Sequence, residues 1–98
     1  MSLPETAEKI KSMEIRGAGR IARAAAEALR DQALATKAAS YPALRQKMEK
    51  AAGLLIATRP TAVSLPNAVH IVMAGLDPAK TVEEARFGIV QSADRFIL

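Results

Sequence analysis

Cysteine and tryptophan are absent from this sequence of 98 residues. Without cysteine the chain has no disulfide framework, no thiolate metal site and no cysteine nucleophile. Its aromatic residues are Tyr41, Phe87 and Phe96, so the core must consist of aliphatic side chains and methionine. The shortage of aromatic rings also argues against binding of single-stranded nucleic acid, because such proteins stack bases on aromatic side chains.

Long apolar runs are missing as well. No segment approaches the roughly 20 apolar residues that span a bilayer, and residues 1–12 lack the apolar stretch of a secretory signal. These absences predict a cytoplasmic protein with no membrane partner. The net charge is +4, but Lys and Arg are spread along the chain. This spread is typical of a solvated surface and makes a nucleic-acid partner a weak hypothesis.

Alanine, the strongest helix former, is abundant, and apolar residues recur with helical spacing. The pattern predicts an all-α fold, a single helical-bundle domain of about five helices. Val69–Met73 fits a short buried strand on periodicity alone, but the proline before it and the glycine after it favour a helix. The expected helices span 4–14, from near Gly19 to the linker 36–40, from Tyr41 to before Arg59, from Pro66 to Gly75, and from Thr81 onward.

Several helix ends carry recognisable signals. Gly75 stands where a left-handed glycine closes a helix, and Ser64 is a candidate N-cap for that same helix. Thr81 and Glu84 have the spacing of a capping box, which opens the last helix.

Arg16-Gly17-Ala18-Gly19 is the first candidate site. A glycine-rich segment that opens a helix presents unpaired backbone N–H groups and a positive dipole end, which suits a phosphate group. Arg16 adds a guanidinium that binds phosphate in bidentate fashion. A plain helix break is the alternative. The spacing also matches part of a dinucleotide-binding fingerprint, which we reject because no strand precedes it.

Arg59 is the second candidate. It lies at a helix end before Pro60, where proline limits the backbone and fixes the direction of the guanidinium. The alternative is that Arg59 balances the helix dipole. His70 is the sole histidine and reads as a packed or surface residue. Glu83 and Glu84 are adjacent, so they point to different faces of a helix and cannot form an acid–base pair. We expect no catalytic residue, no metal site and no cofactor site in this chain.

Two segments resemble signatures of one family. Residues 11–22, with Arg-Gly-Ala-Gly at their centre, and residues 58–68, which begin Thr-Arg-Pro-Thr, are similar to segments of archaeal ribose-1,5-bisphosphate isomerases. These enzymes form one family with methylthioribose-1-phosphate isomerases and the regulatory subunits of translation initiation factor 2B. The resemblance covers most of the chain and is least distinctive from Gly75 to Leu98.

The resemblance implies an N-terminal helical domain that is joined to a larger Rossmann-like domain. It implies that Arg16, Gly17, Ala18, Gly19 and Arg59 contact a phosphorylated sugar during aldose-to-ketose isomerisation in nucleoside monophosphate salvage. The family's catalytic cysteine and aspartate belong to the second domain. We therefore expect residues 1–98 to be the N-terminal domain without its Rossmann-like partner, and to be inactive alone.

Two further expectations stay open. The chain ends on Phe96-Ile97-Leu98, an apolar helix face that resembles the cut edge of a larger protein and favours a homo-oligomer. The alternative function is that of an initiation factor 2B regulatory-subunit domain, which would act by binding translation initiation factor subunits. Arg16 and Arg59 weigh against it, because a regulatory subunit need not keep residues that contact a sugar.

Overall fold

A computed structural model describes residues 3–15, 17–58, 64–76 and 81–97, without the side chains of Ala18 and Ser64. All regular structure in these residues is helical, which confirms the predicted all-α bundle. The elements in chain order are α1 (Leu3–Lys11), α2 (Ala18–Ala35), α3 (Tyr41–Thr58), α4 (Ser64–Met73), the short 3-10 helix η1 (Ala74–Leu76) and α5 (Val82–Ile97).

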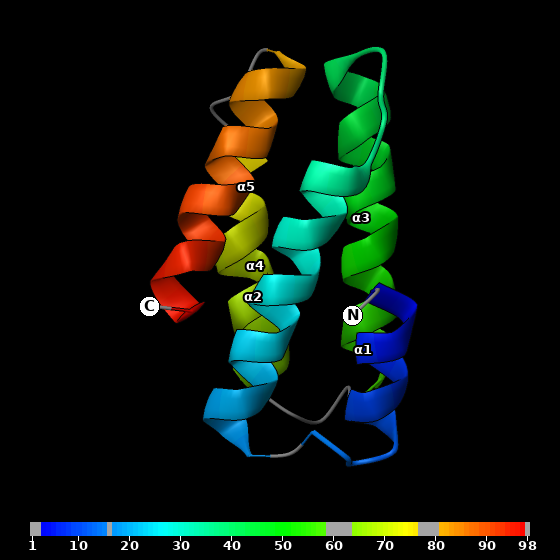
Figure 1. The fold of residues 1–98 in the computed structure, drawn as a ribbon, viewed down its shortest axis with the longest axis vertical. Helices are drawn as coiled ribbons and strands as arrows, with labels where there is room; N and C mark the ends of the chain where they lie inside the picture. The colour runs from blue at the N-terminus through cyan, green and yellow to red at the C-terminus, as the bar shows by residue number, and fades with distance from the viewer. Residues whose placement is uncertain (1–2, 16, 59–63, 77–80, 98) are drawn as a thin grey trace.

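Helix α2 lies at the centre of the bundle, with α1, α3, α4 and α5 all packed against it (Figure 1). Its buried stripe carries Ile21, Ala25, Ala28 and Leu29, which are at most 3% exposed. Alanine at these positions leaves room for neighbouring helices on several sides. These residues recur with helical spacing, so the periodicity of the sequence marks the core face of α2.

The helices alternate in direction along the chain. In Figure 1, α2 and α4 run upward, whereas α1, α3 and α5 run downward. The lower end of the bundle therefore collects the start of α2, the start of α4 and the end of α3. This arrangement matters because both candidate segments border these helix ends.

The end of α1 differs from the prediction. The helix ends at Lys11 instead of Glu14, because Met13 adopts the left-handed region with φ 68°. The turn is closed by backbone bonds: the Ser12 N–H donates to the Glu8 carbonyl at 2.9 Å and the Ile15 N–H donates to the Lys9 carbonyl at 3.0 Å. Met13 had the spacing of a core residue but is 50% exposed.

Gly75 does not close α4 in the left-handed conformation, so that expectation was wrong. It lies within η1, and Gly17 is the sole described glycine with positive φ. Gly75 instead packs against Gly88 of α5. A Cβ built on either glycine would overlap the carbonyl oxygen of the other. Its role is close approach between two elements, which sequence spacing does not reveal.

The start of α5 agrees with its prediction. The Thr81 N–H donates to a Glu84 carboxylate oxygen, and the Glu84 N–H donates to the Thr81 hydroxyl, each at 3.1 Å. These reciprocal bonds are those of a capping box. Helix α4 starts at Ser64, before the expected Pro66, and the predicted N-cap role of the Ser64 side chain lies outside the described residues.

The last turn of α5 is less open than its sequence indicates. Phe96 and Ile97 are partly buried and pack against the core, whereas Leu98 lies outside the described residues. The most exposed large apolar side chain of the described residues is instead Phe87, at 63%. Among the described helices, none is long and apolar enough to cross a membrane.

Candidate functional site

Both candidate segments border the lower end of the bundle. Gly17 precedes the first residue of α2, and Thr58 is the last residue of α3, directly before Arg59. These two flanks lie at the same end because α2 and α3 are antiparallel neighbours (Figure 1). Arg16 and Arg59 themselves lie outside the described residues. Their predicted roles are therefore judged from the described residues next to them in the chain, Gly17 and Thr58.

Gly17 has a backbone that requires glycine. Its φ is 92° and its ψ is 135°, a conformation that residues with a Cβ rarely adopt. The Gly17 carbonyl accepts the Ile21 N–H at 2.9 Å, which begins the α2 ladder. The segment is therefore a helix start shaped by glycine, as predicted.

The start of α2 has no cap of its own. Gly17 occupies the N-cap position and no side chain bonds the first turn there. The first N–H groups of a helix have no partner within the helix, so the amides of Ala18, Gly19 and Arg20 are available to an external acceptor. An anion is the acceptor that helix N-termini favour.

Open space surrounds this helix start. A Cβ built on Gly17 or on Gly19 would meet no atom within 4 Å, and both residues are exposed. Gly19 shows no positive φ, so its conformation does not require glycine. At both positions the missing side chain leaves the backbone accessible to a ligand.

The electrostatics of this end favour a negative charge. Neither α2 nor α4 has an acidic residue in its first turn, where carboxylates would offset the positive helix end. The last turn of α1 adds Lys9 and Lys11. Two helix starts and these two lysines therefore lie at one end of the bundle, where the exposed Glu14 of the turn before α2 is the nearest carboxylate in the sequence.

The ionisable side chains near this end are few. They contain no group of three or more His, Asp or Glu side chains able to hold a metal ion. His70 is exposed and belongs to the last turn of α4, at the opposite end from the α2 start. General acid–base chemistry needs a donor and an acceptor positioned together, and the ionisable side chains described at this end, such as Lys9, Lys11 and Glu14, form no ion pair with one another.

The turn around Met13 leads into this helix start, and sequence reasoning missed its shape. Methionine gives no signal for a left-handed residue, since glycine and asparagine are the residues that favour it. Ile15 follows the turn and packs partly against the core. From α1 to Ile15 the chain thus contains one left-handed residue, backbone bonds that close the turn, and one apolar contact with the core.

Comparison with known proteins agrees with the two signatures. The model of the Initiation factor 2 subunit family matches residues 14–98. Ribose 1,5-bisphosphate isomerase of Methanocaldococcus jannaschii is 48% identical over 95 residues, which cover 97% of this chain and 30% of that protein. The enzyme of the same name from Thermococcus kodakarensis is 50% identical over 97 residues, covering 95% of this chain and 30% of that protein.

The fold agrees as well. The crystal structure of 5-methylthioribose 1-phosphate isomerase from Pyrococcus horikoshii matches with a TM-score of 0.90 and 34% identity, over 97% of this chain and 27% of that one. The chain thus spans less than a third of the length of these relatives. Since the family model matches residues 14–98, which is well over half of the sequence, the chain belongs to the Initiation factor 2 subunit family.

Proposed function

We propose that this chain is the N-terminal, substrate-contacting domain of a ribose-1,5-bisphosphate isomerase. The uncapped, glycine-opened start of α2 carries the proposal, because it offers exposed backbone donors to a phosphate group. The relatives that are about half identical over nearly the whole chain bear the name of this isomerase. In this proposal the Rossmann-like remainder of a longer protein completes the enzyme.

Each residue of the site has a defined part. The backbone amides of Ala18 and Gly19 donate to phosphate oxygens, and Gly17 gives the chain its entry into the helix. Arg16 and Arg59 supply guanidinium groups, which bind phosphate in bidentate fashion. Proton movement between the adjacent sugar carbons takes place on residues outside this chain. The chain alone therefore binds the sugar phosphate without converting it.

Binding is tested on the chain itself by following backbone amide signals in NMR during titration with ribose 1,5-bisphosphate. We expect the amides of Ala18 and Gly19 to shift most, and Arg59→Ala to weaken binding by tenfold or more, since hydrogen bonds to charged groups contribute about 1.5–3 kcal/mol. Arg95→Ala, a change of equal charge on an exposed part of α5, is the control. Shifts confined to other regions would remove the α2 start from the site.

Turnover is tested on the longer protein. Arg59→Ala should lower kcat/KM for the aldose-to-ketose reaction, whereas unchanged activity would exclude Arg59 from the site.

We also infer a cytoplasmic setting and a homo-oligomeric state.

The second candidate is a regulatory-subunit domain that binds a translation initiation factor subunit, favoured by the description of the matching family. Copurification with initiation factor 2, together with no isomerase activity in the longer protein, would favour this candidate over the first.

A further inference from the structure

Helix α1 is half as long as the two helices beside it. It has 9 residues, whereas α2 and α3 have 18 each. At about 1.5 Å per residue, α1 is about 14 Å long, whereas α2 and α3 are each about 27 Å long. Figure 1 shows α1 beside only the lower part of α3. The seam between α2 and α3 is therefore uncovered beyond the N-terminal end of α1.

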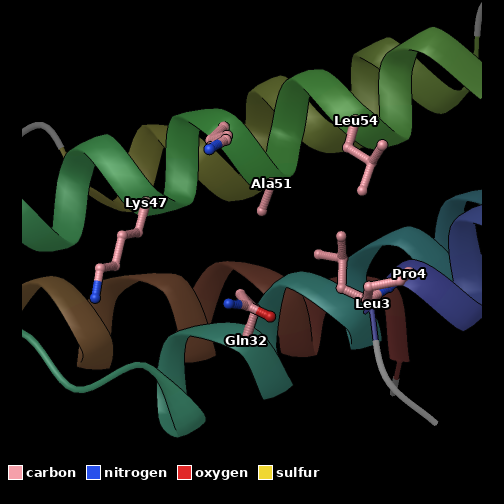
Figure 2. A pocket seen from close by; sticks show the side chains of 7 residues that line it. Leu3, Pro4, Gln32, Lys47, Ala51 and Leu54 are labelled. Carbon is pink, nitrogen blue, oxygen red and sulfur yellow. The ribbon is translucent and has the colours of Figure 1, made fainter.

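A groove of about 510 Å³ occupies this uncovered stretch. Figure 2 shows α1 closing one end and α3 forming a wall opposite Gln32 of α2. Leu3 and Ala51 form its buried apolar base, and Leu54 is 46% exposed at its edge. The residues that line the groove are Leu3, Pro4, Gln32, Lys47, Lys50, Ala51 and Leu54.

The charged side chains that line the groove are all positive. Lys47 and Lys50 line it, and no acidic residue does. The Lys47 ammonium donates to the Lys37 carbonyl at 3.2 Å. Neither ammonium has a carboxylate of the described residues within 4 Å. An occupant that combines an apolar side chain with a carboxylate would match both properties of the groove.

The same chain displays such a combination on α5. Phe87 is 63% exposed and Glu83 stands one helical turn before it, so the two share a face. Glu83 is exposed and no ion pair joins it to a described residue. We name Glu83 and Phe87 the α5 knob.

We propose that the groove receives the α5 knob of a second copy of this chain. Phe87 enters the apolar part between Leu3 and Leu54, and Glu83 lies beside Lys47 and Lys50. The complementary charges and the apolar match carry the inference, and every copy offers both surfaces. The contact is independent of the proposed isomerase activity and of the predicted interface at Phe96 and Ile97.

The apolar half of the contact is tested by sedimentation equilibrium of the 98-residue chain over a wide concentration range. We expect reversible self-association, which Phe87→Ala weakens by at least about tenfold, as expected for a central aromatic anchor. Ile71→Ala, which removes an apolar side chain that is 46% exposed on α4, should leave the association constant unchanged. Circular dichroism of each variant verifies the fold.

The charged half is tested by a double-mutant cycle. Glu83→Lys should weaken association of the otherwise unchanged chain and strengthen it when the groove carries Lys47→Glu and Lys50→Glu. Lys11→Glu, an equal charge reversal outside both surfaces, is the control.

A monomeric chain at every concentration would overturn the proposal. Association that is insensitive to Phe87→Ala, or a Glu83→Lys effect of one sign in both backgrounds, would also overturn it, because the occupant of the groove would then be something other than the α5 knob.

Discussion

At the scale of single residues, Met13 is the clearest case of backbone strain. A left-handed conformation is unfavourable by roughly 1–2 kcal/mol for a residue with a Cβ. Because the side chain is half exposed, its replacement loses little burial. We expect Met13→Gly to raise the free energy of unfolding by up to about 1 kcal/mol in urea denaturation. Glu8→Gly, at an exposed position inside α1, should lower it by about 0.5–1 kcal/mol, and a stabilising effect there would contradict the explanation.

Gly88 and Gly53 form a second contrast between residues. Both lie inside helices, but a Cβ at Gly88 would overlap the Gly75 carbonyl, whereas a Cβ at Gly53 would meet nothing within 4 Å. Gly88→Ala should therefore destabilise the fold by about 1–3 kcal/mol through overpacking. Gly53→Ala should stabilise it by about 0.5–1 kcal/mol. Thermal denaturation of the two variants distinguishes them, and equal effects would refute the close-packing role of Gly88.

At the scale of elements, α5 completes the end of α2. The Arg86 guanidinium donates to the Ala33 carbonyl at 3.1 Å and also to the Thr36 carbonyl. These are carbonyls that a helix end leaves without intrahelical partners. A cation near a helix C-terminus also balances the helix dipole. Arg86 thus joins two elements that are far apart in the sequence.

Replacement of Arg86 should remove the hydrogen bonds that join α5 to the end of α2 and so destabilise the fold. Mutational studies assign about 1.5–3 kcal/mol to a hydrogen bond with a charged group. We therefore expect Arg86→Ala to lower the free energy of unfolding by about 2 kcal/mol. Arg95→Ala, on an exposed part of the same helix, should change it by less than about 0.5 kcal/mol. Chemical denaturation measures both, and similar losses would argue against the junction.

Prediction from the sequence succeeded where the signal is local. The capping box of Thr81 and Glu84 and the linker before Tyr41 depend on residues a few positions apart, and the structure has both. The role of Gly75 was missed because its partner belongs to another helix. The left-handed Met13 was missed because its residue type gives no signal. For the candidate site, the glycine-rich sequence correctly indicated a helix that begins without a side-chain cap. The contacts of Arg16 and Arg59 with a phosphate group stay predictions.

At the scale of the whole molecule, one contiguous core joins all the helices. The Tyr41 hydroxyl donates to the Leu76 carbonyl at 2.7 Å, which links α3 to η1. Tyr41 is the sole tyrosine and tryptophan is absent, so tyrosine fluorescence reports on the surroundings of this one side chain, which include Leu76 and the Arg45 guanidinium that donates to its hydroxyl. We expect its thermal transition to coincide with that of helical circular dichroism, as in a two-state domain. Separate midpoints would show that the α3–η1 contact opens independently of the bundle.

The Arg86 junction also has a consequence for synthesis. The bond to Thr36 spans 50 positions of the chain, so the ribosome must release most of the domain before the central helix gains its last partner. Until then the nascent α2 has exposed carbonyls at one end and an apolar face that awaits α4 and α5. We therefore expect translation pauses before α5 emerges to prolong the exposure of this apolar face, whereas pauses after α5 has emerged should not.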